Sequence, residues 1–349
     1  MLRVLIIKLS AFGDIIHSLP VIEYFEEFSK KNNTKVELHW LIEKRWSPII
    51  DKHPGVHHVL LTDTTHWRRA VLQKTTWKEI YDCVSGLRDH LYDMVLDING
   101  LMRSALFARL ARAHLRVGFS KDSDICKEKH SVCLLDKTHS VPHIHVVDQT
   151  IKLLEMTLPV DLPNPLMPYL PSNHIVEEMA KEVIEKKGLI PNRFAVIAAG
   201  GGWETKLLDE KIMAELCDHI TQYKLIPVLS WSGSHEKERA MRISELSKNQ
   251  VKQIGNLPVD VFVGVLRMSR IVVGPDTGTV HAASAVKTPT VSYYGPSSAK
   301  YSGPRRFTDR VVQLSPHCGP CFKRECSENL CNHLNIQMIL DEISNLLEE

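Results

Sequence analysis

The sequence predicts an α/β protein made of two doubly wound domains. Short apolar runs typical of buried strands alternate with amphipathic helical patterns along the whole chain, which favours parallel sheets. A proline-rich stretch near the middle interrupts this alternation. At 349 residues the chain is also long for a single hydrophobic core. We therefore expect one domain over 1–165 and a second over 172–334, with a ligand-binding cleft between them.

The first half opens on a nearly continuous apolar run, Leu2–Leu9, which is typical of a central parallel strand buried on both faces. An amphipathic pattern then predicts a helix from about Ile15 to Lys31. Further strands are expected at Val36–Ile42, His58–Thr62, Tyr92–Ile98 and Arg116–Phe119, and further helices at Thr76–His90, Leu101–Ala113 and Val146–Met156. Strands that alternate with helices in this way indicate a doubly wound parallel sheet.

The segment Leu158–Pro171 is too rich in proline for a regular helix or a central strand. Its prolines are Pro159, Pro163, Pro165, Pro168 and Pro171. We interpret this segment as a linker between the domains and expect the domains to close across it as a hinge.

The alternation restarts after the linker with a predicted helix at Ile175–Lys187. Strands are expected at Phe194–Ala199, Leu225–Trp231, Val251–Ile254, Ile271–Gly274 and Thr290–Tyr294, and helices at Asp209–Gln222, His235–Lys248, Val259–Met268 and Thr279–Val286. A last helix over 336–349 follows a cysteine-rich loop, and we expect it to pack back on the first domain.

The composition is that of a globular protein and excludes several classes of partner. Hydrophobic residues make up 44% of the chain and charged residues 24%, which is ordinary for such proteins. The net charge of +2 gives no reason to expect a nucleic acid partner. Apolar runs fall far short of the roughly 18 residues of a membrane span, and the N-terminus has the pattern of a strand rather than of a signal peptide. We therefore expect a cytoplasmic protein.

The stretch 272–283 carries the clearest sign of an anion-binding site. A short apolar strand turns through Gly274–Gly278 into a helix, which points free N–H groups and the positive end of a helix dipole at one spot. Such a spot suits a phosphate. Asp276 lies at the carboxyl end of the strand, where open α/β sheets bind their ligands. The alternative is an Asp that caps an ordinary turn between strand and helix.

A second turn that suits an anion, Gly200–Lys206, follows the first strand of the second half. Three consecutive glycines leave N–H groups unobstructed and Lys206 adds a positive charge, although the spacing does not match an ATPase phosphate loop. A flexible surface loop is the alternative. Glu236, after the next strand, either compensates a helix dipole or accepts hydrogen bonds from ribose hydroxyls. Two such turns in one half suggest a diphosphate.

The first turn of the chain places Asp14 at the start of a helix, directly after Gly13. Gly13 permits a close approach of the backbone, and Asp14 either caps the helix or projects into the cleft. The turn lacks the Gly-x-Gly-x-x-Gly spacing, so a nicotinamide dinucleotide is not indicated.

Basic side chains in the first half suit an anionic ligand. They are Arg68, Arg69, Arg103, Lys127 and His145. Arginine pairs with phosphate or carboxylate through two parallel hydrogen bonds. A solvated charged face is the alternative explanation for each of them taken singly.

Four cysteines near the C-terminus, Cys318, Cys321, Cys326 and Cys331, lie within fourteen residues, with His317 and His333 beside them. Four thiols have the ligand count of a structural zinc site, but the spacing matches such a site only in part. Either a metal or ordinary thiols packed in a loop would account for them.

Four motifs taken together resemble the bacterial lipopolysaccharide heptosyltransferases, glycosyltransferase family nine. They are Lys8–Pro20 (KLSAFGDIIHSLP), Asp97–Ala105 (DINGLMRSA), His145–Gln149 (HVVDQ) and Gly274–Ala283 (GPDTGTVHAA). The resemblance covers nearly the whole chain in the right order, and His17–Pro20 is most similar to the type I enzymes.

The resemblance implies a GT-B fold, in which two Rossmann-like domains bind the sugar donor in the C-terminal domain and the acceptor in the N-terminal one. It implies inverting transfer of L-glycero-D-manno-heptose from ADP-heptose to the Kdo of the lipid A inner core, during lipopolysaccharide core biosynthesis. It further implies peripheral association with the cytoplasmic face of a Gram-negative inner membrane and no requirement for a cofactor or metal.

Carried over residue by residue, the resemblance makes Asp14 the general base that deprotonates the acceptor hydroxyl. It implies a donor pocket of Gly201, Gly202, Lys206, Glu236, Asp276, Thr277, Gly278 and His281, with Glu236 on the adenosine ribose. It implies that the acceptor contacts Gly13, Arg68, Arg69, Asn99, Arg103, Lys127 and His145.

Two other functions remain open. One is a family-nine transferase that uses another nucleotide sugar or another core acceptor. The other is a non-catalytic protein that binds a nucleotide sugar. The combination of Asp14, Lys206 and Asp276 argues against the second, because a binding protein has no need of a base.

Overall fold

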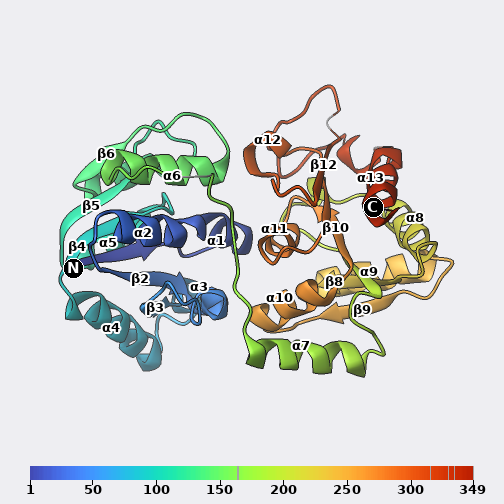
Figure 1. Ribbon diagram of the computed structural model, residues 1–349, viewed down its shortest axis with the longest axis horizontal. Coiled ribbons are helices and arrows are strands. Elements are labelled where there is room, and N and C mark those ends of the chain that lie inside the picture. The colour runs from blue at the N-terminus through green and yellow to red at the C-terminus, as the bar shows by residue number, and fades with distance from the viewer. Residues whose placement is uncertain (163–164, 315, 329, 334, 349) are drawn as a thin grey trace. The chain divides into compact units, whose positions relative to one another are not determined.

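A computed structural model describes residues 1–162, 165–314, 316–328, 330–333 and 335–348 (Figure 1). The chain divides into two compact units, Met1–Pro168 and Tyr169–Glu349, each built on one six-stranded sheet. The division falls inside the proline-rich segment, whose Pro163 lies outside the described residues. Among the described helices, none has the length and apolar character needed to span a bilayer.

The first unit is built on a sheet with the strand order β3-β2-β1-β4-β5-β6. Its strands are β1 (Leu2–Ile7), β2 (Val36–Glu43), β3 (His58–Thr62), β4 (Tyr92–Asp97), β5 (Ala113–Phe119) and β6 (Lys137–His139). All neighbouring strands pair in parallel. In the central strand β1, residues 4–7 are fully buried, because their side chains are apolar on both faces of the sheet.

The helices of the first unit are α1 (Phe12–Ser18), α2 (Pro20–Lys31), α3 (Thr64–Arg69), α4 (Lys74–Asp89), α5 (Met102–Leu110) and α6 (Val146–Thr157), with 3-10 turns at Lys44–Ile49 and Lys129–Leu134. Helix α6 contacts both α1 and α2, and α4 and α5 pack with Leu5 and Ile7 in a core cluster. The helix predicted from Ile15 to Lys31 is therefore two helices. Pro20 starts the second one, because proline has no N–H to continue the ladder but fits the first helical position.

The second unit repeats this plan with the strand order β12-β11-β10-β7-β8-β9, also parallel throughout. Its strands are β7 (Phe194–Ala198), β8 (Ile226–Trp231), β9 (Lys252–Gly255), β10 (Ile271–Pro275), β11 (Thr290–Tyr294) and β12 (Asp309–Gln313). Its helices are α7 (His174–Lys186), α8 (Glu210–Thr221), α9 (Ser234–Leu246), α10 (Val259–Met268), α11 (Gly278–Ala285), α12 (Ala299–Ser302) and α13 (Gln337–Glu348), with 3-10 turns at Glu204–Lys206 and Leu330–His333.

Both sheets have the strand order of doubly wound dinucleotide-binding folds, which confirms the predicted fold class. In such a sheet the chain reverses its direction of travel at one point, and ligands bind beside the carboxyl ends of the two strands that meet there. These strands are β1 and β4 in the first unit, and β7 and β10 in the second. Ligand sites are therefore expected at the turns that follow these four strands.

The last helix differs from our expectation that it packs back on the first domain. The apolar side of α13, including Ile339, Ile343 and Leu346, is buried in the core cluster of the second unit. This helix contacts α8, β11 and β12, and the Ser344 hydroxyl lies 3.2 Å from His219 Nε2 on α8. The expectation was wrong because an apolar stripe shows that a helix is covered without showing which sheet covers it.

Replacing Ile343 tests this packing. Ile343 is completely buried, so Ile343→Ala should lower the free energy of unfolding of the second unit by about 2–5 kcal/mol, as large-to-small core substitutions do. Urea unfolding followed by circular dichroism measures the change. Met338→Ala on the exposed side of the same helix, where Met338 is 56% exposed, should leave the stability nearly unchanged. Equal stability of the two variants would contradict the observed packing.

Candidate functional site

The clearest polar cluster of the second unit lies at the carboxyl ends of β7 and β10. Lys206 belongs to the 3-10 turn that follows the glycine loop after β7, and Asp276 directly follows β10. The Lys206 Nζ lies 2.6 Å from Asp276 Oδ2 and donates a second hydrogen bond, of 3.0 Å, to the Asp276 carbonyl oxygen. Both side chains are nearly buried. The structure thus brings together two residues that are 70 positions apart in the chain.

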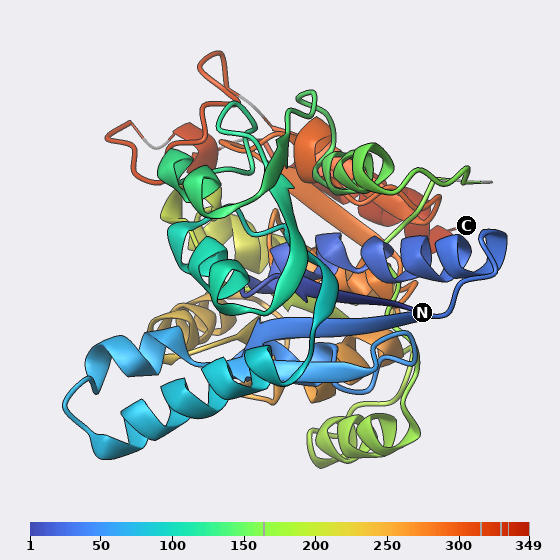
Figure 2. The ribbon, with the colours of Figure 1, turned by 90° about the vertical axis from the view of Figure 1, so that its left-hand side faces the viewer.

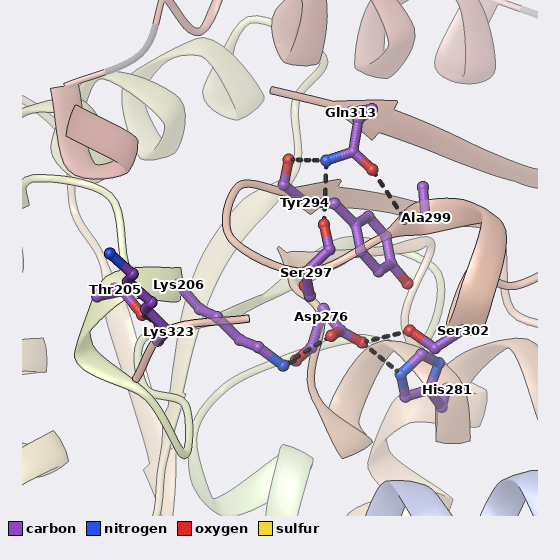
Figure 3. A network of polar contacts seen from close by, with 10 residues as sticks. All are labelled: Thr205, Lys206, Asp276, His281, Tyr294, Ser297, Ala299, Ser302, Gln313 and Lys323. Carbon is purple, nitrogen blue, oxygen red and sulfur yellow. Dashed lines mark hydrogen bonds and ion pairs between the residues drawn. The ribbon is translucent and has the colours of Figure 1, made fainter. Parts of the chain in front are cut away.

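Asp276 is held from its other side as well (Figure 3). Its Oδ1 lies 3.1 Å from His281 Nε2 and accepts a hydrogen bond of 3.2 Å from the Ser302 hydroxyl. Burial alone would raise the pKa of Asp276, but the hydrogen bond with His281 and the charge of Lys206 lower this pKa well below its ordinary value. Asp276 is therefore a fixed carboxylate rather than the cap of a helix, because the N-cap of α11 is Thr277.

The glycine loop packs closely against the residues that were predicted to bind the donor. A Cβ atom added to Gly200 would lie 2.0 Å from the Glu236 side chain, and one added to Gly201 would lie 3.1 Å from Thr277 Cγ2. Gly202 has open space on its Cα. The Glu236 carboxylate in turn accepts a hydrogen bond of 2.7 Å from the Ser232 N–H. The loop is therefore closely packed at Gly200 and Gly201, and among these three glycines only Gly202 has open space beside it.

The start of α11 has hydrogen-bonding groups that suit an anion. Thr277 makes no side-chain capping bond to the first turn, which contains Gly278. Its buried Oγ1 also has no hydrogen-bond partner within the described parts of the chain. A buried hydroxyl and uncapped backbone N–H groups at a helix N-terminus fit a phosphate oxygen.

Two further side chains of this cluster were not predicted from the sequence. Ser302, in the short helix α12, is the third partner of Asp276. Trp203 lies under the Lys206 ammonium, with Nζ 4.3 Å from the ring centroid. The tryptophan was detectable, because an aromatic ring three residues before a loop lysine suits a cation–π contact. Ser302 was not, since nothing local links it to a turn 26 residues away.

In the first unit, Asp14 occupies the third position of α1, at the carboxyl end of β1. Its Oδ2 accepts a hydrogen bond of 3.2 Å from the Ala11 N–H. The carboxylate therefore caps the start of the helix, which is one of the two predicted alternatives. The side chain is nevertheless exposed, which leaves the carboxylate accessible to a ligand. Gly13 precedes it in the same turn and is half-buried.

Two buried ionisable side chains, Lys8 and Asp97, lie at the carboxyl ends of β1 and β4. Lys8 directly follows β1, and its ammonium donates a hydrogen bond of 3.1 Å to the Ile98 carbonyl. Burial lowers the pKa of Lys8, which the charges of Asp14 and Asp97 raise and that of Lys127 lowers. Burial also raises the pKa of Asp97, to about 6, against the hydrogen bonds it accepts from the Asn99 and Gly100 N–H groups and from Ser104.

The predicted acceptor residues Asn99 and Arg103 connect loops of the first unit that follow different strands. The buried Asn99 Oδ1 accepts a hydrogen bond of 3.1 Å from the Leu9 N–H, and so ties the end of β4 to the end of β1. Arg103 donates hydrogen bonds to the Ser10 hydroxyl at 2.8 Å and to the Thr64 hydroxyl at 3.0 Å. Asn99 and Arg103 thereby join the loops that follow the carboxyl ends of β1, β3 and β4.

The remaining predicted acceptor residues are more peripheral. Arg68 and Arg69 are exposed in the last turn of α3, the helix that Arg103 contacts at its first residue. Lys127 is exposed, and its N–H donates a hydrogen bond of 3.0 Å to the Gly100 carbonyl. His145 is the N-cap of α6, with its Nδ1 accepting from the Val147 N–H at 3.3 Å.

The raised pKa of Asp97 predicts a pH dependence of stability. The folded state keeps the proton of Asp97 up to about pH 6, whereas the unfolded chain loses it near the ordinary value of 3.8. Stability contributed by the protonated form is therefore complete below the unfolded pKa and is lost as the pH rises through the folded one. Between pH 3.8 and about pH 6, we expect the free energy of unfolding of the wild-type protein to fall by about 3 kcal/mol relative to that of Asp97→Asn.

Urea unfolding at a series of pH values measures this difference, because other titrating groups cancel between the two proteins. Asn keeps an oxygen for the Asn99 and Gly100 N–H groups and cannot titrate, so it isolates the proton. Parallel curves for the two proteins would contradict the raised pKa of Asp97.

The cysteine-rich segment provides no assembled metal site in the described part of the chain, where no three His, Cys, Asp or Glu side chains are grouped for an ion. Cys318 and Cys326 are exposed, and Cys321 and Cys331 half-buried. Burial raises the pKa of the Cys331 thiol, and the charges of the other three cysteines raise it further. The side chain of His333 lies outside the described residues.

Comparison with known proteins agrees with this architecture. The family model described as "Glycosyltransferase family 9 (heptosyltransferase)" matches residues 80–332. The chain is 26% identical to lipopolysaccharide heptosyltransferase 1 of Escherichia coli strain K12 over 347 residues, which cover 99% of this chain and 100% of that protein. It is also 26% identical to lipopolysaccharide heptosyltransferase 1 of Pseudomonas aeruginosa, over 93% of this chain and 88% of that one.

Similarity to solved structures supports the fold independently. The structure of the E. coli heptosyltransferase WaaC with ADP matches this chain with a TM-score of 0.78 at 22% identity. The match covers 99% of this chain and 100% of that chain. Each of the two units is therefore one of the Rossmann-like domains of a GT-B fold.

Proposed function

Because this chain belongs to glycosyltransferase family 9, the heptosyltransferase family, we propose that it transfers L-glycero-D-manno-heptose from ADP-heptose to the Kdo of the lipid A inner core. This reaction belongs to lipopolysaccharide core biosynthesis. The observation that carries the proposal is the polar cluster at the carboxyl ends of β7 and β10, the switch point of the second sheet. There, Lys206, the open start of α11 and the unsatisfied Thr277 hydroxyl suit a diphosphate.

In this proposal the second unit holds the donor. Gly201, Gly202, Thr277 and Gly278 contact the diphosphate through N–H and hydroxyl groups, and Lys206 neutralises its charge. Asp276 and His281 fix the position of the lysine. Glu236 accepts hydrogen bonds from the adenosine ribose, as acidic residues do at the end of the second strand in dinucleotide folds. This ligand matches relatives that carry ADP or an ADP-heptose analogue in solved structures.

The first unit holds the acceptor. The exposed guanidinium groups of Arg68 and Arg69 pair with the anionic groups of Kdo and lipid A, and Lys127 and His145 add further contacts. Arg103 positions the loops that carry the acceptor, since it joins Ser10 to Thr64. Gly13 and Asn99 contribute mainly through backbone shape, because the Asn99 side-chain oxygen is already used by the Leu9 N–H.

The chemistry is an inverting displacement. The Asp14 carboxylate accepts the proton of the acceptor hydroxyl, whose oxygen forms the new bond to the anomeric carbon of the heptose. The bond from that carbon to the diphosphate oxygen breaks on the opposite face, and ADP leaves with the electron pair. Lys206 and the N–H groups of α11 stabilise the charge that develops on ADP, so no metal or cofactor is assigned a step.

The proposal places the protein at the cytoplasmic face of the inner membrane of a Gram-negative bacterium, where it associates peripherally. The lipid acceptor and the exposed basic residues of the first unit support this location. We propose no nucleic acid partner.

Calorimetric titration of the donor tests the proposal. We expect ADP-heptose to bind more tightly than ADP, ADP-glucose or UDP-glucose, because both the adenine nucleotide and the heptose contribute contacts. Equal affinity for ADP-heptose and ADP would assign the pocket to the nucleotide alone, and preference for UDP-glucose would replace the proposed donor. Either result would favour a family-9 transferase with another nucleotide sugar.

A further inference from the structure

Helices α3 and α4 form a hairpin whose tip extends away from the first sheet (Figure 2). Four large apolar or aromatic side chains on it are exposed to solvent. Val71 is 51% exposed, Leu72 95%, Trp77 59% and Tyr81 71%. Trp77 and Tyr81 are four residues apart on α4 and so lie on the same helix face. Exposed apolar and aromatic side chains gathered on one hairpin indicate an interaction surface.

The exposure belongs to an ordered structure. The Thr76 hydroxyl donates a hydrogen bond of 2.8 Å to the Ala70 carbonyl, and the Trp77 indole donates one of 2.9 Å to the Val71 carbonyl. At the base of the hairpin, the Trp67 indole donates to Glu79 at 2.9 Å and packs against Phe107 of the core. The hairpin is therefore anchored at its base, and hydrogen bonds join the residues of its tip.

Positive charge surrounds the apolar tip. Residues 66–78 contain four cations and no Asp or Glu, although the whole chain carries a net charge of only +2. The cations are Arg68, Arg69, Lys74 and Lys78, and all four are exposed. At 100° per residue, Lys74 and Lys78 lie beside the aromatic face of α4, whereas the carboxylates of Glu79 and Asp82 lie further round the helix.

Aromatic rings, an aliphatic tip and flanking cations suit the interface of an anionic bilayer. Trp and Tyr bury an apolar body and keep a polar edge in the headgroup region, while Lys and Arg pair with lipid phosphates. A projecting apolar tip inserts readily into the fluid interface of a bilayer, whereas a protein partner would need a pocket that matches the shape of the tip. We propose that residues 71–81 of the α3–α4 hairpin, the docking hairpin, insert into the surface of an anionic phospholipid bilayer.

This inference rests on the proposed function in one respect, since it locates the membrane contact that a lipid-linked acceptor requires. Its test uses neither donor nor acceptor, so the two proposals fail separately. Vesicle binding through the docking hairpin without heptosyl transfer would overturn only the function. Heptosyl transfer by a protein that does not bind vesicles would overturn only the docking hairpin.

The experiment is co-sedimentation of the full chain with phosphatidylcholine vesicles, with and without phosphatidylglycerol. We expect wild-type protein to bind the anionic vesicles and Leu72→Ser combined with Trp77→Ser to bind at least about tenfold more weakly. Leu72→Ser alone should weaken binding severalfold, and it disturbs no packing because Leu72 is almost fully exposed. The matched control Phe307→Ser, at a site 92% exposed in the second unit, should bind like wild type.

The charge contribution has its own readout. Lys74→Gln combined with Lys78→Gln should weaken binding to the phosphatidylglycerol vesicles and make it less sensitive to salt. The proposal is overturned if wild type does not bind anionic vesicles, or if Leu72→Ser and Phe307→Ser bind equally. It is also overturned if the Leu72→Ser variant instead dissociates an oligomer in sedimentation without vesicles, since a second copy then covers the patch.

Discussion

Asp14→Asn should reduce the rate of heptosyl transfer by about 10²–10⁴-fold, the usual contribution of a general base, while the donor still binds. Asn retains an oxygen that can accept the Ala11 hydrogen bond, so the start of α1 keeps its cap. It cannot accept the proton of the acceptor hydroxyl. The expected result is a loss of kcat with little change in the affinity for ADP-heptose or in the melting temperature.

A control separates this loss from a general effect on helix starts. Asp260 lies in the first turn of α10 and accepts a hydrogen bond of 2.9 Å from the adjacent Val261 N–H. Asp260→Asn should therefore leave transfer unchanged. Undiminished kcat in Asp14→Asn would remove Asp14 from the role of base, and a parallel loss in both variants would assign the effect to folding.

Lys206→Met should weaken ADP binding and lower kcat/KM by about 10²–10³-fold, because it removes the cation that stabilises the departing diphosphate. Met retains an unbranched apolar stem beside Trp203 and carries no charge. The variant also leaves the Asp276 carboxylate without its nearest cation, so part of the loss can come from structure.

Adenosine distinguishes the two causes, because it contacts the nucleoside pocket but carries no phosphate. If Lys206 acts on the diphosphate, Lys206→Met weakens ADP binding and leaves adenosine binding unchanged. Lys211→Ala, an exposed lysine of the same unit, should change neither affinity. Equal losses for ADP and adenosine would show that Lys206 only supports the fold of the pocket.

The sequence predicted the strands that carry strong apolar patterns and missed those that do not. The edge strands β6 and β12 are short and mostly polar, so no run of apolar residues reveals them. Helix α3 has the sequence TTHWRR, which has no apolar period, and forms because Asp63 caps it and Trp67 reaches the core. These elements depend on tertiary neighbours that a local pattern does not contain.

The candidate site was predicted as a set of turns rather than as a set of contacts. Glycine spacing and strand ends indicated the turns at Gly200–Lys206 and Asp276–Gly278, and the strand order explains why they meet. The ion pair of Lys206 with Asp276 and the use of Asn99 as a tie between strands follow only from the fold. The roles of these residues in catalysis, and the cleft between the two units, stay predictions.

The proposed function is tested most directly by the reaction itself, with purified protein, ADP-heptose and Kdo-lipid A. Mass spectrometry of the acceptor and NMR of the new linkage measure the outcome. We expect the acceptor to gain one heptose for each ADP released, with inverted anomeric configuration. Retention of configuration, or failure to modify the Kdo acceptor while the donor is bound, would contradict the proposed function.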